Sequence, residues 1–424
     1  MKKYKIIILV CIFTLLGIFI GRVTNQNNVY KENENNQIKK HVDTISMMLE
    51  KDIKSGNYEM TTRETWPTEG YVFNPTLSKC ENGGELSWDD ENKRVLMSGN
   101  VSDKCYVYFD KYIPKISDVC SSNENLASCV KKFGDKGSVV SNIYLHNSSL
   151  ENSAKDNSYR YFGANPDNYV CFGSTEEVCP YNNLYRIIGV FGNQVKLIKY
   201  DYATSSELGT DGDYAGLYKD NHFVEDNGNW YLGNNYENIA VYYWNNATKK
   251  NIWSESNLNK INLNTNFINY IGEKWSNKIT TTKWQIGGCS WDDVVNNIPY
   301  NLYEKEILNP AENILYEAKI GLPYMSDFFY TAEQKYWTEL VRDSINNTND
   351  YRKFEKELWI NQGLIEWSIT REYGYDISVH QYKNVLSTKT IEPGRLIRPT
   401  FYLDTTVNYS SGDGSKSNPI RIVI

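Results

Sequence analysis

The hydrophobic pattern of the chain begins with one dense apolar run. The residues from Ile6 to Gly21 carry no charge, and Lys5 and Arg22 flank them. A membrane-spanning helix needs about 20 residues, and long basic side chains at its ends reach the interfaces of a shorter one. Three lysines precede the run, which places the N-terminus in the cytoplasm and the remainder outside. We predict an uncleaved transmembrane anchor over residues 1–23, with a cleaved signal peptide as the alternative.

A polar stalk and a short amphipathic helix are expected over residues 24–57. Residues 24–37 are rich in asparagine and charge. Apolar side chains then recur at spacings of three and four, the period of a helix that buries one face. These positions are Ile38, Val42, Ile45, Leu49 and Ile53. Ser55, Gly56 and Asn57 end the stretch.

Residues 58–112 have the pattern of a small β domain. Strand-like runs at 70–73, 84–88, 94–97 and 105–109 alternate with turn residues. A unit of this size buries little apolar surface, so a covalent staple would help it to fold. Residues 113–158 are interpreted as a linker region that contains one short helical piece over 125–133.

The rest of the chain, residues 159–424, is interpreted as one large α+β domain. Apolar runs at 186–191 and 194–200 flank Gly192 and Asn193, which predicts a two-residue hairpin. Apolar residues four apart from Leu263 to Trp275 predict an amphipathic helix. A capping box at residues 331–334 predicts a second helix through Val341. Strands are expected again at 399–403 and 419–424.

Cysteine spacing is consistent with export. Seven of the eight cysteines follow the anchor. Pairing of sequence neighbours gives three disulfide candidates, whose alternative is free thiols in a core. The candidates are Cys80 with Cys105, Cys120 with Cys129, and Cys171 with Cys179. Cys289 has no obvious partner, and the absence of a C-x-x-C motif disfavours zinc.

Composition excludes several classes of function. The net charge is −7, which argues against a basic surface for nucleic acid. The four histidines are scattered, so a histidine-rich metal site is not expected. The chain contains 34 tyrosines and 11 tryptophans, enough for a core and for aromatic binding surfaces. Phosphate-binding, dinucleotide-binding and serine-hydrolase motifs do not occur.

Two groups of side chains are candidates for binding. Aromatic rings interleaved with amides suit the faces and hydroxyls of sugars, with core packing as the alternative. This group is Trp230, Tyr231, Tyr236, Tyr243, Trp244 and Asn245. Asp211 and Asp213 flank a glycine and are the candidates for calcium, but the full calcium-loop pattern is absent and an ordinary turn is the favoured alternative. No other cofactor is expected.

Several motifs together resemble exported proteins of AT-rich Gram-positive bacteria, most of them functionally uncharacterised. The motifs are WPTEGYVFN at 66–74, DKCYVYFD at 103–110, YRYFGANPD at 159–167, LYRIIG at 184–189, WNN at 244–246, GLIEWS at 363–368 and RLIRPTFYL at 395–403. Some members of that group have pilin-like N-termini, but this chain lacks the charged leader that such a start requires.

The motifs at 363–368 and 395–403 are also similar to the end of C-type-lectin-like domains of the formylglycine-generating-enzyme kind. That resemblance implies irregular antiparallel strands flanked by helices. It also implies a structural role, fastening the terminal strands, for Glu366, Trp367, Arg395 and Arg398. The cysteine pair, the clustered histidines and the calcium signature of active members are missing here, so their chemistry does not transfer.

Together these patterns predict a single-pass protein of the cell membrane whose C-terminal domains are extracellular. The expected function is non-catalytic binding of an extracellular glycan or protein, with the membrane as partner of the N-terminal helix and no role for nucleic acid. Two alternatives remain open. One is an exported carbohydrate-active hydrolase that uses paired carboxylates; the other is a structural component of a pilin-like surface assembly.

Overall fold

The computed structural model describes residues 44–62, 65–67, 70–98, 103–217, 239–338, 357–376, 378–382, 386–389 and 394–424. The chain divides into two compact units, Met1–Ile113 and Pro114–Ile424, and each is described by itself. The predicted anchor and most of the predicted stalk, residues 1–43, lie outside the described residues.

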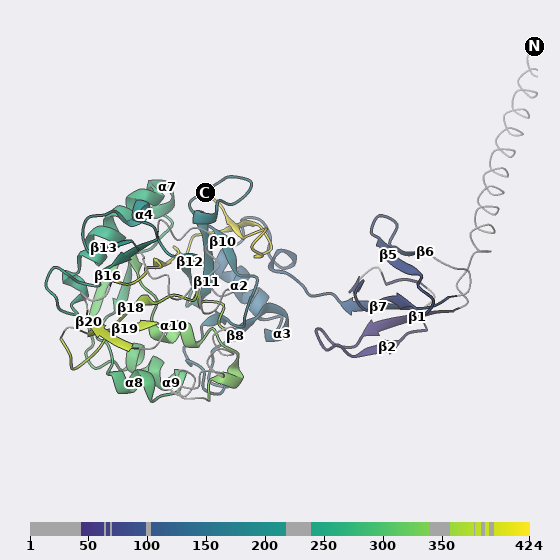
Figure 1. Cartoon of the computed structure of the whole chain (residues 1–424), viewed down its shortest axis with the longest axis horizontal. Coiled ribbons are helices and arrows are strands. Elements are labelled where there is room, and N and C mark those ends of the chain that lie inside the picture. Colours follow the sequence, from purple (N-terminus) through teal and green to yellow (C-terminus); the bar gives the residue numbers. More distant parts are fainter. Residues whose placement is uncertain are drawn as a thin grey trace, which may run out of the picture. The chain divides into compact units, whose positions relative to one another are not determined.

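The smaller unit is a β domain, as predicted, built around the long strand β7 (Figure 1). Four strands form a sheet in the order β2-β1-β7-β3, β4 also pairs with β7, and β5 and β6 form a separate hairpin. Their bounds are β1 (Thr44–Glu50), β2 (Tyr58–Met60), β3 (Tyr71–Phe73), β4 (Lys79–Cys80), β5 (Glu85–Asp89), β6 (Arg94–Ser98) and β7 (Lys104–Lys111). The predicted disulfide Cys80–Cys105 is confirmed and joins β4 to β7.

The amphipathic helix predicted from Ile38 to Ile53 is wrong in its described part. Residues 44–50 are strand β1, which pairs in parallel with β7 from Thr44 opposite Lys104 to Leu49 opposite Phe109. A short apolar run is compatible with the spacing of a helix and with that of a strand. Here strand β7, about sixty residues away, supplies backbone hydrogen bonds that stabilise the strand. The carboxylate of Glu50 then accepts N–H groups of Gly56 and Lys111, closing the end of the pair.

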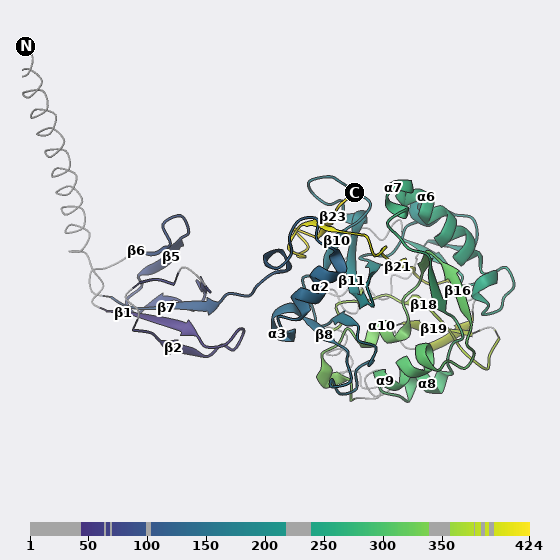
Figure 2. The ribbon, with the colours of Figure 1, turned by 180° about the vertical axis from the view of Figure 1, so that it is seen from behind.

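An antiparallel sheet of seven strands organises the larger unit (Figure 2). Its order is β17-β21-β12-β11-β9-β8, with β10 paired to β11. The bounds are β8 (Ile143–Leu145), β9 (Tyr159–Tyr161), β10 (Tyr169–Cys171), β11 (Leu184–Phe191), β12 (Gln194–Lys199), β17 (Ile320–Gly321) and β21 (Thr400–Tyr402). The hairpin predicted at Gly192 and Asn193 is confirmed, because Phe191 pairs with Gln194 across it.

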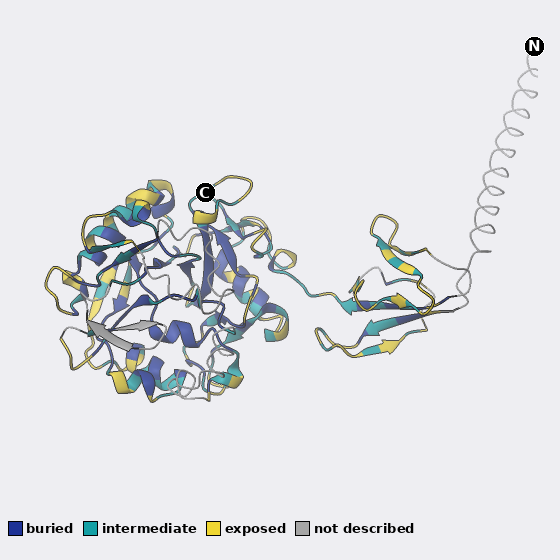
Figure 3. Ribbon diagram, in the orientation of Figure 1, coloured by how far each residue is buried: buried dark blue, intermediate teal, exposed yellow. Residues whose placement is uncertain are grey.

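Burial is greatest along the two central strands of this sheet. Almost every residue of β11 and β12 is buried, whereas peripheral loops are exposed (Figure 3). One continuous apolar core surrounds the strands. It includes five tryptophans with almost no exposed surface: Trp244, Trp253, Trp284, Trp337 and Trp367.

Shorter strands and helices complete the larger unit. The strands are β13 (Tyr214–Leu217), β14 (Ala240–Tyr242), β15 (Thr282–Gln285), β16 (Leu315–Ala318), β18 (Glu366–Arg371), β19 (Ser378–Tyr382), β20 (Leu386–Lys389), β22 (Tyr409–Ser411) and β23 (Arg421–Ile422). The α-helices are α2 (Leu126–Gly134), α3 (Ser138–Ser141), α4 (Ser205–Leu208), α6 (Ile268–Ile271), α7 (Glu273–Ser276), α8 (Trp291–Val295), α9 (Pro299–Tyr303) and α10 (Met325–Phe329). The 3-10 and π-helices are η1 (Ile116–Asp118), η2 (Tyr181–Asn183), η4 (Trp253–Glu255), η5 (Leu258–Phe267), η6 (Glu304–Leu308) and η7 (Gln334–Tyr336).

The fold-class prediction is wrong. The described chain is mixed α/β, with many short strands and few, short helices, and is not the predicted α+β arrangement of irregular antiparallel strands and flanking helices. The capping box at Thr331 opens no long helix in the described chain, where only η7 follows it. None of the helices in the described ranges is both long and apolar enough to cross a membrane.

The region from 113 to 158 is part of the larger unit and not a linker. The predicted helical piece is present as α2, which begins after Asn125, whose side chain accepts the N–H of Ser128. Strand β8 follows and pairs with β9 at the edge of the main sheet. This segment therefore contributes to the core, because Leu126, Val130 and Phe133 are buried in it.

Candidate functional site

The predicted sugar-binding group does not form an open aromatic surface in the described residues. Trp230, Tyr231 and Tyr236 lie outside them. Trp244 is fully buried against Trp253, and its Nε1–H donates to the carbonyl of Ser368 at 3.0 Å. Asn245 is also buried, and Tyr243 is half-buried. Neither ring face of Trp244 is open to a ligand in solvent.

The predicted calcium residues hold the backbone together instead of converging on a cation. Asp213 is buried, and its two carboxylate oxygens accept the N–H groups of Asn246 at 2.8 Å and Leu258 at 2.7 Å. Asp211 accepts from the amide of Asn266 at 2.7 Å. Since N–H donors occupy the Asp213 oxygens, they are poorly placed to bind a cation as well.

One other group of metal-ligand side chains comes together within the described part of the chain, namely Cys80, Asp103 and Cys105. The two sulfurs are bonded to each other. Asp103 accepts N–H groups of Asn82 at 2.8 Å and Gly84 at 3.0 Å. A disulfide has no thiolate to offer a metal, so this group stabilises a turn.

Glu366 and Arg398 form a buried ion pair. Arg398 Nε donates to Oε2 at 2.8 Å and Nη2 donates to Oε1 at 2.6 Å, and both side chains have at most 1% of their surface exposed. Burial raises the pKa of Glu366, and the Arg398 charge opposes that shift. The pair links β18 to the segment that precedes β21. It therefore holds these two C-terminal strands together.

The two neighbouring residues also serve packing. Trp367 is fully buried, and its Nε1–H donates to the carbonyl of Tyr242 at 2.8 Å. Arg395 exchanges backbone hydrogen bonds with Tyr242, and its guanidinium lies 6.0 Å from the Trp367 ring. These contacts tie β14 to the C-terminal segment and place no reactive group at a surface.

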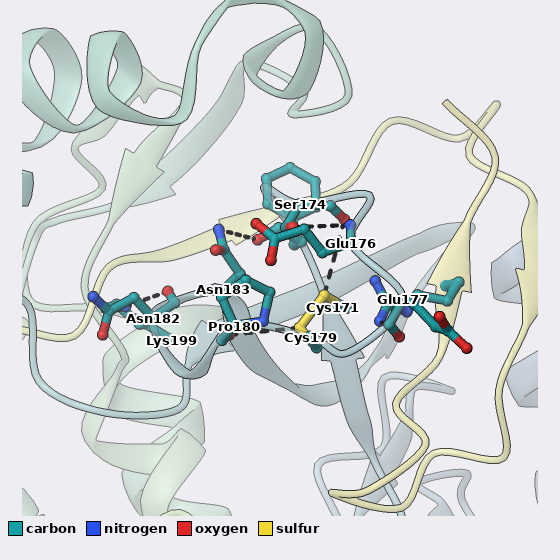
Figure 4. The surroundings of a disulfide bond; sticks show 11 residues. Cys171, Ser174, Glu176, Glu177, Cys179, Pro180, Asn182, Asn183 and Lys199 are labelled. Atoms are coloured by element: carbon teal, nitrogen blue, oxygen red, sulfur yellow. Dashed lines mark hydrogen bonds between the residues drawn. A yellow bond between two sulfur atoms is a disulfide. The ribbon is translucent and has the colours of Figure 1, made fainter.

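Two of the three predicted disulfides are confirmed. The second, Cys171–Cys179, closes the loop between β10 and η2 (Figure 4). Beside it, the amide of Asn183 donates to the carbonyl of Phe172 at 3.2 Å, which holds the two ends of the loop together. Cys289 is buried, and burial raises the pKa of its thiol well above the ordinary value, which disfavours a nucleophilic role.

Cys120 and Cys129 are not bonded in the structure, but their thiols are in hydrogen-bonding contact. This contact, together with burial, raises the pKa of Cys120. We expect the chain to contain the third disulfide when it is isolated from an oxidising compartment. Both cysteines fall on one tryptic peptide, residues 116–131. Without reduction, that peptide should resist alkylation and weigh two hydrogens less than the dithiol form.

The control for this measurement is internal. Cys289, which is a reduced thiol in the structure, should be alkylated in the same denatured, unreduced sample. Two alkyl groups on peptide 116–131, together with an intact Cys171–Cys179 bond, would contradict the expectation.

No sequence pattern pointed to the network of buried polar groups that surrounds Arg160. The guanidinium donates to Asp156 at 2.6 Å and to Ser158 at 2.7 Å, and lies 4.7–4.9 Å from the rings of Phe191, Tyr303 and Tyr330. Burial alone would raise the pKa of Asp156, but the Arg160 charge and hydrogen bonds from Ser158 and Tyr303 outweigh it and hold the pKa low. All these groups are engaged with one another.

His146 lies beside this network in its neutral form. Its Nδ1 accepts the N–H of Ala154 at 3.1 Å, so the proton is on Nε2. The ring packs edge-on to Tyr330 and against Trp337. Burial, reinforced by the positive charge of Arg160, holds the pKa of His146 well below its ordinary value.

Three exposed aromatic residues that the sequence analysis did not single out, Trp291, Tyr373 and Tyr375, lie on two segments that are neighbours in the structure, and they are referred to below as the exposed aromatic face. Their exposed fractions are 37%, 46% and 64%. The segments that carry them are neighbours, because the N–H of Tyr373 donates to the carbonyl of Cys289 at 2.9 Å, two residues before Trp291. The turn at 372–376 is anchored by the buried amide of Asn251, which donates to the carbonyls of Glu372 at 2.9 Å and Tyr375 at 2.7 Å.

Three kinds of comparison bear on identity, and all gave the same result. The chain matches no protein-family model, no curated protein and no solved structure.

Proposed function

We propose that this chain is an exported, non-catalytic binding protein that recognises a glycan through the exposed aromatic face. The observation that carries the proposal is the display of three rings, Trp291, Tyr373 and Tyr375, on backbone that is already tied down. A ring on backbone that is already held in place can stack on a sugar face at a smaller entropy cost, because little backbone freedom remains to be lost.

The surroundings of the face favour a sugar over an apolar partner. Asp292 and Asp376 are exposed next to the rings, whereas the exposed Glu312 on the neighbouring segment is already paired with Arg371. Carboxylates accept hydrogen bonds from hydroxyls, whereas they would be desolvated at cost under an apolar partner. The mixture of rings and acceptors therefore suits a hydroxyl-rich polymer.

The engagement of the buried carboxylates in the described part of the chain leaves none of them available as a catalytic pair. Every buried carboxylate in the described ranges accepts a hydrogen bond or forms an ion pair within the chain. These are Glu50, Asp103, Glu207, Asp213, Glu306, Asp327, Glu366 and Glu372. A glycosidase needs a pair free to face its substrate. The two disulfides support export, since such bonds persist outside the cytosol.

The experiment is a glycan array probed with the full chain, followed by titration of the best ligand. We expect Tyr373→Ala and Tyr375→Ala each to weaken binding by about tenfold or more, which corresponds to about 1.4 kcal/mol. The matched control is Tyr270→Ala, which removes a tyrosine of the same 46% exposure from α6, outside the face.

Two results would contradict the proposal. One is equal loss of binding in Tyr270→Ala and in the two variants of the face. The other is release of reducing sugar from the ligand by the wild-type chain, which would favour the hydrolase.

A further inference from the structure

A lysine and an aspartate meet in the core of the larger unit. Lys196 is on β12 and Asp327 is on α10, 131 residues later. Lys196 Nζ lies 2.6 Å from Asp327 Oδ2, and only 1% and 3% of the two side chains are exposed. An amine and a carboxyl group are thus held in contact where water has little access.

Aromatic rings surround the amine. The centroids of Phe191, Trp284, Tyr324 and Tyr402 lie 4.7–5.7 Å from Lys196 Nζ. Rings attract an ammonium group, but they also exclude water. Burial lowers the pKa of Lys196, with Asp327 acting against that shift, so the neutral amine is more accessible than at a surface.

The carboxyl group is held by the first turn of α10. Asp327 Oδ2 accepts the N–H of Tyr324 at 2.9 Å. The buried Glu306 accepts the N–H groups of Met325 at 2.9 Å and Ser326 at 3.0 Å, and so positions the same turn from η6. Reacting groups held in contact behave as if at very high concentration, which removes much of the entropic barrier to bond formation.

We propose that Lys196 and Asp327 become joined by an intramolecular isopeptide bond. The bond forms between Lys196 Nζ and Asp327 Cγ, and one bond from Cγ to a carboxyl oxygen breaks. That oxygen leaves as water with two protons from the amine and acid groups. The ammonium and carboxylate pair is therefore converted to an amide plus one water molecule, and no oxidant, reductant or cofactor takes part.

The chain contains an internal comparison in Lys199 and Glu207, which also form a buried pair, at 2.8 Å. There the ammonium group has a second oxygen partner, the carbonyl of Asn182 at 2.7 Å. The carboxylates do not distinguish the two pairs, since Glu207 accepts the N–H of Thr204 as Asp327 accepts the N–H of Tyr324. The carbonyl contact stabilises the ammonium form of Lys199, whereas rings surround Lys196 Nζ, so the Lys199 pair stays an ion pair while the Lys196 pair condenses.

Peptide mapping of the reduced, alkylated full chain tests the proposal directly. Trypsin does not cleave after a lysine whose amine is part of an amide. We expect a branched species that joins residues 187–199 to residues 320–335 and is lighter than the sum of the two by one water molecule. Cleavage after Lys199 in the same species shows that the comparison pair is not linked. Recovery of the linear peptide 187–196 and of unmodified 320–335 in full yield would overturn the proposal.

A second measurement uses Lys196→Arg, which keeps a cation beside Asp327 but replaces the amine with a poorly nucleophilic guanidinium. On a denaturing, reducing gel the wild type should migrate faster than this variant, because the bond closes a large loop that heat and detergent cannot open. Equal migration of the two chains would count against the bond. If the variant fails to fold, the wild-type peptide map still decides.

Discussion

The variant Glu366→Ala is expected to lower the free energy of unfolding of the larger unit by about 3–5 kcal/mol. The loss follows from what is left behind, because Arg398 would stay buried, with 1% of its side chain exposed, after the carboxylate that accepts two of its hydrogen bonds has been removed. Chemical denaturation followed by tryptophan fluorescence measures the change, since five buried tryptophans of this unit report on its core.

The matched control is Glu317→Ala, which breaks an ion pair of the same unit at its surface. Lys283 and Glu317 lie 3.7 Å apart with 65% of each side chain exposed, and exposed pairs contribute about 0–1 kcal/mol. A Glu366→Ala chain that unfolds within about 1 kcal/mol of the wild type would show that the buried pair is not the fastening inferred for it.

Acidification below neutral pH is expected to destabilise the larger unit through His146. The folded state holds this imidazole neutral, because burial and Arg160 lower its pKa, whereas the unfolded chain takes up a proton near pH 6.5. Below that pH the unfolded state binds more protons, so the free energy of unfolding falls by about 1.4 kcal/mol per pH unit until the folded pKa is reached.

The measurement is the free energy of unfolding as a function of pH, for the wild type and for His146→Asn, and the result is the difference between the two slopes. Asparagine retains an acceptor for the N–H of Ala154 but does not titrate. The difference matters because the buried Glu306 and Glu366, whose pKa values are raised by burial, favour the folded state as the pH falls. Identical slopes between pH 7 and pH 5 would exclude His146 as the source.

The parts of the fold that the sequence predicted correctly have local causes. The turn at Gly192 and Asn193, the strands of the smaller unit and the start of α2 after Asn125 each depend on neighbouring residues. The disulfides Cys80–Cys105 and Cys171–Cys179 each join two cysteines that follow one another along the chain with no other cysteine between them.

The wrong predictions have non-local causes. The helical spacing from Ile38 to Ile53 was overruled by parallel pairing of β1 with β7, a partner that no local pattern reveals. At Thr331 the capping motif was present, but the threonine is buried and its hydroxyl donates to the carbonyl of Phe328. That contact closes the end of α10 and starts no new helix.

Whether a residue could belong to the candidate site depended on its burial, which the sequence does not reveal. Trp244 was a candidate because of its aromatic neighbours, yet it lies in the core. Trp291, Tyr373 and Tyr375 were not singled out, because Trp291 is far in the sequence from the two tyrosines and their segments become neighbours only where the N–H of Tyr373 donates to the carbonyl of Cys289. Arg160 and His146 were missed for the same reason, since nothing in the sequence tells which charged side chains are inside.

The central hairpin of the larger unit has a consequence for how the chain reaches its native state. β11 and β12 carry Arg186, Lys196 and Lys199 into the interior. Two of their partners arrive from distant parts of the chain: Trp359, whose carbonyl accepts from Arg186, and Asp327, which pairs with Lys196. A premature collapse around this hairpin would trap unneutralised cations, so we expect the ribbon to form early but to be enclosed only in a late, rate-limiting step.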